Sequence, residues 1–244
     1  MSEKEKFTPP ETERKVTTFD DLMDHERVVP ADYQKLILLQ EQRTKENSGR
    51  FMDTHYSDNW SVVFNSKGEY AKLTEQELQY FKERLQGQAL VDLGGGSGGV
   101  MFDLAANLAR AQMYINVDRG RFHPNKPPNP LEPTDIIPSQ DQSRFIVKVK
   151  ADMLDFISRM KDGSANFAIN GIDSIIVSDP RYNEALAKEL VRATRSGGLI
   201  FGLESEALLI LRDQINKGEV NLREHVVPKE ISTMMREHIF EKPE

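Results

Sequence analysis

The residues from Ala89 to Gly99, A-L-V-D-L-G-G-G-S-G-G, constrain the fold of this chain more than any other stretch. An apolar run with a single acid, Asp92, is followed by five glycines in six residues. Glycine allows a chain to leave a buried strand, turn sharply and come close to a ligand. Residues 100–110 then carry apolar side chains at helical spacing. The stretch therefore predicts a strand, a glycine turn and a helix, which together form a nucleotide-binding corner.

The glycines fit two nucleotide-binding patterns, and the acid favours one of them. Gly94, Gly96 and Gly99 match the dinucleotide pattern, whereas Asp92 with Gly94, Gly96 and Gly98 matches the pattern of enzymes that use S-adenosylmethionine (SAM). A carboxylate just before the first glycine would repel a pyrophosphate but attract the ammonium and sulfonium groups of SAM. The helix N-terminus could then receive the methionine carboxylate. A nicotinamide-dependent dehydrogenase is the alternative that Asp92 disfavours.

Composition limits the class of protein. The 244 residues, 38% hydrophobic and 29% charged, suffice for one α/β core with extensions. No apolar run approaches the length of a membrane span, and the N-terminus is charged where a signal peptide would be apolar, so we expect a cytoplasmic protein. The absence of cysteine and the five scattered histidines argue against a metal site. The net charge of −7 disfavours a broad nucleic-acid-binding surface.

Two segments precede the glycine stretch. Residues 1–30 are polar and contain prolines, and we expect a flexible arm with one short helix near residues 19–25. Residues 31–88 are expected to form a helical and aromatic cap, with helices at 31–47 and 74–86. Between them, residues 51–70 concentrate six aromatic side chains, counting His55. These aromatic residues either pack a small satellite core or line a ligand pocket.

Acids follow the next two expected strands. Residues 113–117 form a strand that ends at Asp118, a place from which a carboxylate can accept both ribose hydroxyls of an adenosine. Residues 144–149 form another strand, and Asp152 comes shortly after it. Its carboxylate could accept a hydrogen bond from the adenine amino group, while the backbone N–H of Met153 meets a ring nitrogen.

Strands and helices alternate along the rest of the chain, which predicts a doubly wound sheet. Further strands are expected at 166–170, 199–203 and 222–227, with an edge strand at 238–243, and helices at 154–160, 180–195 and 207–215. One connection is anomalous, because six prolines prevent a crossover helix of normal length between residues 119 and 143. We expect this segment to be a lid beside the ligand, with a static crossover packed on the sheet as the alternative.

Taken together, the motifs V-D-L-G-G-G-S-G-G, I-N-V-D at 115–118, K-A-D-M at 150–153 and the segments 162–170 and 189–201 resemble a class I (Rossmann-like) SAM-dependent methyltransferase. The resemblance implies a doubly wound, mostly parallel, seven-stranded sheet over residues 89–244, with an N-terminal helical extension. It also implies SAM as cofactor. The cofactor-binding residues that it implies are Asp92, Gly94, Gly95, Gly96, Asp118, Asp152, Met153 and Asn170.

The expected reaction is transfer of a methyl group by direct displacement, which depends on alignment and desolvation more than on an acid or base. No catalytic residue is therefore evident, and the candidates for a base are His55, Tyr56, His123 and Asp173. We expect a small-molecule acceptor rather than nucleic acid; the oligomeric state is left open. The alternative is a catalytically silent subunit that binds SAM or S-adenosylhomocysteine (SAH).

The segment Asp179-Pro180-Arg181-Tyr182 resembles the D-P-P-Y signature of amino-methylating enzymes. That signature follows directly after the fourth strand, whereas Asp179 lies nine residues beyond the expected end of this strand at Asn170. Asp179 and Pro180 instead fit the capping residue and first position of a helix. We therefore expect capping rather than catalysis from this segment.

Overall fold

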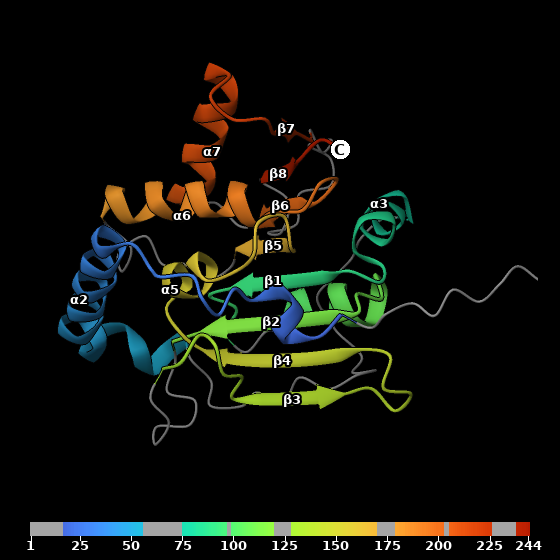
Figure 1. Cartoon of the computed structure of the whole chain (residues 1–244), viewed down its shortest axis with the longest axis horizontal. Coiled ribbons are helices and arrows are strands. Elements are labelled where there is room, and N and C mark those ends of the chain that lie inside the picture. Colours follow the sequence, from blue (N-terminus) through green and yellow to red (C-terminus); the bar gives the residue numbers. More distant parts are fainter. Residues whose placement is uncertain are drawn as a thin grey trace, which may run out of the picture.

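A computed structural model describes residues 17–55, 75–96, 99–119, 128–169, 179–202, 205–225 and 238–244; for residues 44–55, 77, 99 and 100 it describes the backbone alone. Eight strands form one sheet (Figure 1). They are β1 (Ala89–Leu93), β2 (Met113–Asp118), β3 (Asp135–Pro138), β4 (Phe145–Lys150), β5 (Asn166–Ile169), β6 (Leu199–Gly202), β7 (Arg223–Glu224) and β8 (His238–Glu241).

The strand order is β3-β4-β2-β1-β5-β6-β8-β7. The five central strands β4, β2, β1, β5 and β6 are parallel, and β3, β8 and β7 pair antiparallel with their neighbours. The α/β class with a mostly parallel sheet is thus confirmed. The sheet has one strand more than expected, because β3 forms within the proline-rich segment. The expected edge strand at 238–243 is wrong in its position, since β8 lies between β6 and β7 and the two-residue strand β7 forms the edge.

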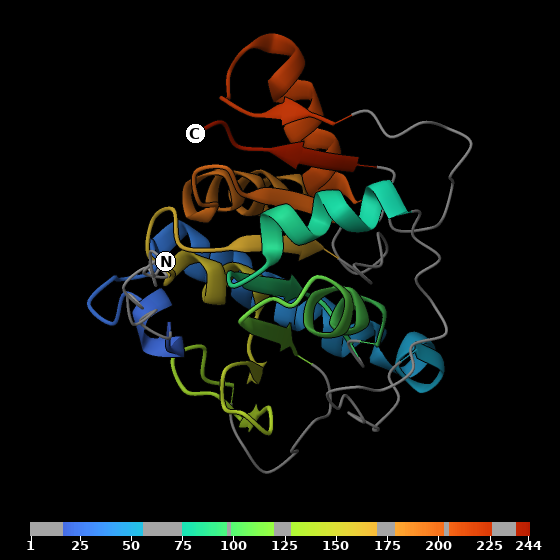
Figure 2. The ribbon, with the colours of Figure 1, turned by 90° about the vertical axis from the view of Figure 1, so that its right-hand side faces the viewer.

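Helices cover both faces of the sheet (Figures 1 and 2). One face carries α1 (Phe19–Leu22), α2 (Ala31–His55), α5 (Met153–Ser158), α6 (Pro180–Ala193) and α7 (Glu206–Lys217). The other face carries α3 (Glu75–Leu85), α4 (Gly99–Phe102) and the π-helix η1 (Asp103–Leu108). Within the described part of the chain, no helix combines the length and the apolar character needed to cross a membrane.

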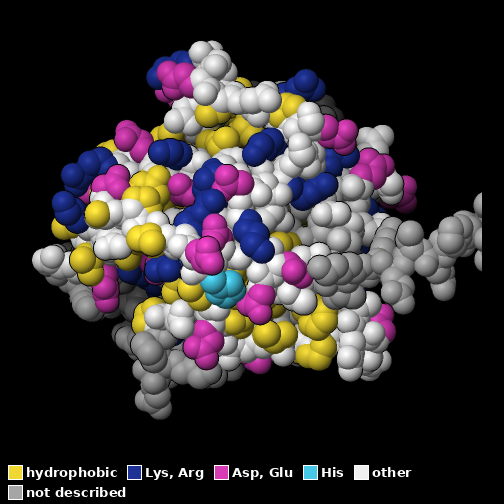
Figure 3. All heavy atoms as spheres, viewed as in Figure 1, with side chains coloured by type: hydrophobic (Ala, Val, Ile, Leu, Met, Phe, Trp, Pro, Cys, Tyr) yellow, Lys and Arg dark blue, Asp and Glu magenta, His cyan; other side chains and the backbone are white. Residues whose placement is uncertain are grey.

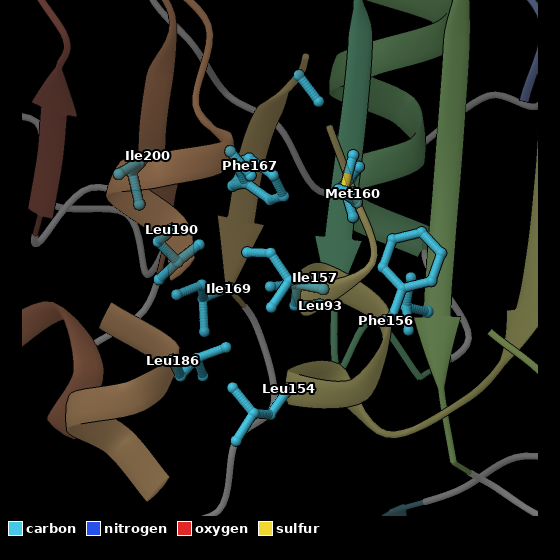
Figure 4. Close-up of a cluster of buried hydrophobic side chains, with 14 of the residues drawn as sticks. Leu93, Leu154, Phe156, Ile157, Met160, Phe167, Ile169, Leu186, Leu190 and Ile200 are labelled. Atoms are coloured by element: carbon cyan, nitrogen blue, oxygen red, sulfur yellow. The ribbon is translucent and has the colours of Figure 1, made fainter. Parts of the chain in front are cut away.

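The larger of two apolar cores lies between the sheet and the face formed by α5 and α6. Figure 4 shows side chains of β1, β5, α5 and α6 converging there, among them Leu93, Phe167, Ile157 and Leu190. All four are fully buried. Because the central strands alternate between this core and the smaller one on the opposite face, both faces of the parallel sheet are protected from water.

The segment between residues 17 and 30 differs from the loose arm that we expect from its sequence. Phe19, Leu22 and Met23 are buried in the larger core, and Arg27 donates a hydrogen bond of 2.8 Å to Asp162. Although the segment is mostly polar, these three apolar side chains are sufficient to dock the short helix α1 against the larger core. Residues 1–16 lie outside the described residues. The expected cap at 31–88 is divided in the structure, because α2 packs on one face of the sheet and α3 on the other.

The helix expected over residues 100–110 is present but changes its winding. After α4, the chain continues as the π-helix η1, in which Ala109 N–H donates to the carbonyl of Leu104 over 2.7 Å. The guanidinium of Arg144, which precedes β4, donates to the carbonyl of Ala106. Ala106 lies in the last turn of η1, where backbone carbonyl groups have no partner within the helix, and Arg144 satisfies one of them.

Candidate functional site

The strands β1, β2 and β4 are adjacent and parallel, so their carboxyl ends meet at one edge of the sheet. In Figure 1 this edge lies where the arrowheads of β1, β2 and β4 point. The glycine turn follows β1, Asp118 is the last residue of β2, and Asp152 comes two residues after β4. The structure therefore brings together most of the cofactor-binding residues that the sequence predicts.

Asp92 lies beneath the glycine turn and is fully buried. Its carboxylate accepts a hydrogen bond of 2.6 Å from the hydroxyl of Tyr114, which is also buried. Burial, and then the neighbouring carboxylate of Asp92, raise the pKa of the Tyr114 hydroxyl well above its usual value of 10.0. A Cβ at Gly95 would lie 2.5 Å from Asp92 Oδ2, so the turn rests directly on this carboxylate.

The glycine turn is fastened to β2 at three points. Gly94 N–H donates to the carbonyl of Val117 over 2.9 Å, and Gly96 N–H donates to Asp118 Oδ2 over 2.8 Å. Asn116 Nδ2 donates to the carbonyl of Gly96 over 3.2 Å. Gly94 and Gly96 have φ angles of 72° and 51°, a region in which glycine avoids the steric cost of a Cβ. The backbone N–H and the backbone carbonyl of Gly96 are thus both held by side chains of β2.

Asn116 is a site residue that sequence reasoning missed. Its side chain is buried, and its Oδ1 atom has no hydrogen-bond partner among the described residues. A Cβ at Gly95 would lie 2.7 Å from this oxygen, so it faces the glycine turn. A signal was present in the sequence, because residues two apart on a strand share one face and Asn116 stands two residues before Asp118.

Asp152 caps α5, and its carboxylate contacts four donors of its own chain. Oδ1 accepts from the backbone N–H groups of Leu154 and Asp155 over 2.9 and 3.1 Å. The Tyr182 hydroxyl lies 3.0 Å from each carboxylate oxygen, and Arg119 Nε lies 3.3 Å from Oδ2. Burial raises the pKa of the Asp152 carboxyl, while Arg119 and the hydrogen bonds lower it. Met153, the first residue of α5, is half-buried beside this cluster.

The segment that begins at Asp179 has the capping role that its sequence predicts. Asp179 caps α6 by accepting from Arg181 N–H over 3.1 Å, and Pro180 occupies the first turn. The Asp179 carboxylate also pairs with the guanidinium groups of Arg181 and of Arg43 on α2. Tyr182 is fully buried and points to Asp152. The motif therefore links α2, α6 and the end of β4.

A row of polar residues crosses the sheet beneath the glycine turn. Asp92, Asn116, Lys148 and Asp135 stand opposite one another on β1, β2, β4 and β3. Lys148 is buried, and its Nζ lies 3.9 Å from Asp135 Oδ2. Burial lowers the pKa of the Lys148 ammonium, and the Asp135 carboxylate raises it. Lys148 is the second residue of this polar row that sequence reasoning missed, although it interrupts the apolar strand R-F-I-V-K-V.

Several predicted residues cannot be placed. Asn170, Tyr56, His123 and Asp173 lie outside the described residues, as do residues 120–127 of the expected lid; for His55 only the backbone is described. Among the residues that are described, histidine, aspartate and glutamate side chains form no group of three or more that could hold a metal ion.

No protein-family model and no curated protein matches this sequence. The chain is similar in fold to solved methyltransferases. The antibiotic-resistance methyltransferase Kmr is 15% identical, with 72% of this chain and 97% of Kmr covered at a TM-score of 0.41. An rRNA methylase from Streptococcus thermophilus is 11% identical, with 71% of this chain and 100% of the methylase covered at a TM-score of 0.44. A Streptococcus mutans protein in complex with SAH is 12% identical, with 69% of this chain and 95% of that protein covered at a TM-score of 0.42. At these scores the similarity concerns the fold, and neither activity nor substrate follows from it.

Proposed function

We propose that this protein binds SAM at the carboxyl ends of β1, β2 and β4 and transfers its methyl group to a small-molecule acceptor by direct displacement. The observation that carries the proposal is the fastening of the Gly96 peptide between Asp118 and Asn116, directly above the buried Asp92. This arrangement holds a turn of left-handed glycines at a fixed distance from buried carboxylates. It is an arrangement suited to a ligand that carries both a ribose and a positive charge.

The charge of this corner fits SAM better than a dinucleotide. Asp92, Asp118 and Asp152 are all buried there, and one guanidinium, that of Arg119, pairs with Asp152. A pyrophosphate would add negative charge to these carboxylates, whereas the ammonium and sulfonium groups of SAM would reduce their repulsion. Apart from its chain neighbours, no atom of the described residues lies within 4 Å of a Cβ placed at Gly96, so the described part of the site leaves this side of the turn open to a ligand.

Each residue of the site has a part in the proposal. Asp118 would accept the ribose hydroxyls, and Asp152 with the N–H of Met153 would recognise the adenine. The glycines 94–96 and Asp92 would lie at the methionine end, and Asn170 at the rim. When bound, SAM supplies an activated methyl group on a sulfonium centre. The chain then has to orient the acceptor and exclude water, which requires no acid or base of its own.

The acceptor is proposed to be a small molecule because the net charge is negative and one face of the described surface carries mixed charges. Figure 3 shows acidic and basic side chains interleaved over the face that carries α1 and α6. The chain as a whole has a net charge of −7. Nucleic-acid binding depends on a continuous basic surface that neutralises phosphates. Binding of a small-molecule acceptor does not require such a surface.

Calorimetric titration with SAH, SAM and NAD tests the binding part of the proposal. SAH and SAM should bind and NAD should not, and Asp118→Ala should weaken SAH binding by about 1 to 3 kcal/mol, because hydrogen bonds to a charged acceptor are lost. Asp155→Ala is the matched control, since Asp155 is an acid of α5 that pairs with Arg159. Binding of NAD with no response to SAM or SAH would overturn the assignment.

Methyl transfer is tested with labelled SAM and a cell extract separated into small molecules and macromolecules. Incorporation with the small-molecule fraction supports the proposal. Label that enters the macromolecular fraction alone would refute the small-molecule acceptor. SAH binding without turnover in either fraction would identify the silent, SAM-binding subunit instead.

A further inference from the structure

The carboxylate of Asp152 is surrounded by donors of which one is replaceable. The N–H groups of Leu154 and Asp155 belong to the first turn of α5, and the hydroxyl of Tyr182 is fully buried. The remaining contact is the ion pair with Arg119, whose side chain is 27% exposed. The first three donors are fixed by the helix and the core. A ligand that approaches Asp152 from solvent can therefore displace only Arg119 at low cost.

The register of β2 and β4 puts Arg119 between Asp118, proposed to bind the ribose, and Asp152, proposed to bind the adenine. Asp118 pairs with Lys150, and Ala151 N–H donates to the carbonyl of Asp118 over 3.2 Å. Arg119 directly follows Asp118 and Asp152 directly follows Ala151, and their side chains meet just beyond the sheet edge. A ligand with its ribose on Asp118 and its base near Asp152 must occupy the space where the guanidinium now lies.

We propose that Arg119 occupies the base-recognition position on Asp152 in the ligand-free protein, and that adenosine binding exchanges its guanidinium for the 6-amino group of adenine. The inference rests on the proposed function and adds a residue that sets affinity and base selectivity. In the free protein Arg119 compensates the charge of a buried carboxylate. In the complex the amino group donates to the same oxygen, and the guanidinium moves to solvent. Arg119 therefore competes with the ligand instead of holding it.

Removal of this competitor has an effect opposite to the removal of a binding residue. Arg119→Met keeps the length of the side chain but has no donor and no charge. It should bind SAH about three- to tenfold tighter than the wild type, because no partly buried ion pair has to be broken. Arg119→Lys retains a charge that can reach Asp152 and should stay close to the wild type. Arg159→Met is the matched control, since Arg159 is also 27% exposed and pairs with Asp155 on α5.

The base selectivity gives a readout that a merely structural role would not move. S-inosylhomocysteine is SAH with an oxygen in place of the 6-amino group, and this oxygen cannot donate to Asp152. The displaced guanidinium of Arg119 can donate to this oxygen but not to an amino group, so the wild type keeps part of its affinity for S-inosylhomocysteine. The ratio of the two dissociation constants should therefore widen by at least a similar factor in Arg119→Met and stay unchanged in Arg159→Met. Calorimetry at neutral to mildly alkaline pH measures both constants for each variant.

The outcomes separate this inference from the proposed function. If Arg119→Met weakens SAH and S-inosylhomocysteine equally, Arg119 holds the ligand, and the exchange is refuted while SAH binding stands. An unchanged SAH affinity and an unchanged ratio also refute the exchange. If neither the wild type nor any variant binds SAH, the proposed function itself is refuted, and the exchange with it.

Discussion

The hydroxyl of Tyr114 offers the sharpest test of how the glycine turn is supported. Tyr114→Phe removes one oxygen and leaves the ring in place, so its edge-on contact with Phe102, at a centroid distance of 5.6 Å, is retained. The void left behind is no larger than one oxygen atom. What it removes is the 2.6 Å hydrogen bond to Asp92, which is the shortest described contact of that carboxylate.

The expected loss follows from the burial of both partners. A hydrogen bond to a charged group contributes about 1.5 to 3 kcal/mol, and a buried acceptor that loses a donor cannot recover it from water. For a chain of this size, such a loss corresponds to a fall in melting temperature of about 3 to 12 °C. Urea unfolding followed by circular dichroism gives the free energy, provided that the m-value is unchanged. Tyr80→Phe is the matched control, because its hydroxyl makes a longer bond of 3.4 Å to the half-buried Glu241.

A double-mutant cycle with Asp92→Asn identifies the interaction itself. If the two side chains are coupled, the second substitution should cost less once the first has been made, with an interaction energy of about 1 kcal/mol or more. The reasoning fails if Tyr114→Phe costs no more than Tyr80→Phe. It also fails if the costs of Tyr114→Phe and Asp92→Asn are strictly additive.

Three further predictions concern the turn, the cap and the N-terminal segment. Gly95→Ala places a Cβ 2.5 Å from Asp92 Oδ2, so it should lower the free energy of unfolding by about 1 to 3 kcal/mol and remove much of the SAH affinity measured by calorimetry. Gly218→Ala is the control, because it adds strain at a φ of 71° far from the site and should spare the affinity. Equal losses of affinity in the two variants would contradict this prediction. Asp179→Asn should keep the free energy of unfolding, measured by urea titration, within about 0.5 kcal/mol of wild type because asparagine caps as well as aspartate. A large fall would show that the pairs with Arg43 and Arg181 matter more than the cap. Hydrogen bonds from Arg192 and Arg27 lower the pKa of Asp162 below 3.8, so its contribution to stability is complete above that pH and is lost as the pH falls through the lower, folded pKa. The difference in urea midpoint between wild type and Asp162→Asn should therefore be clear at about pH 6 and shrink steadily as the pH falls below 3.8, and a difference that does not shrink in acid would exclude this ion cluster as its source.

The sequence predicts the parallel core of the sheet because each central strand is a short apolar run followed by a polar or glycine signal. The five parallel strands all occur close to their expected positions. The acids that follow them could be placed as well, since parallel strands end at a common edge. The position of β8 could not be predicted, because its neighbours are decided by pairing with β6 over a long distance in the sequence. Alternation of side chains gives no information about that choice.

Contacts within the site depend on side-chain geometry that the sequence pattern does not contain. An acid after β4 was expected at residue 152, but not the engagement of its carboxylate by Tyr182, thirty residues further on. The segment at 17–30 shows the same limit, because composition indicated disorder while Phe19, Leu22 and Met23 supply enough apolar surface to dock. In both cases a few long-range contacts decide the structure.

The proline-rich segment shows how a departure from the expected crossover contributes to the site. Its second part, residues 128–143, contains β3, which covers the edge of β4 and ends at Pro138, a residue with no backbone N–H to offer to a further strand. This corrects the expectation that the whole segment is a lid, and for residues 128–143 it agrees with the alternative of a crossover that packs on the sheet. β3 also brings Asp135 next to the buried Lys148, which stands opposite Asn116. Asn116 in turn holds the carbonyl of Gly96. A buried ammonium needs a nearby counter-charge, so the strand that replaces the helix also compensates the charge of the polar row on which the glycine turn rests.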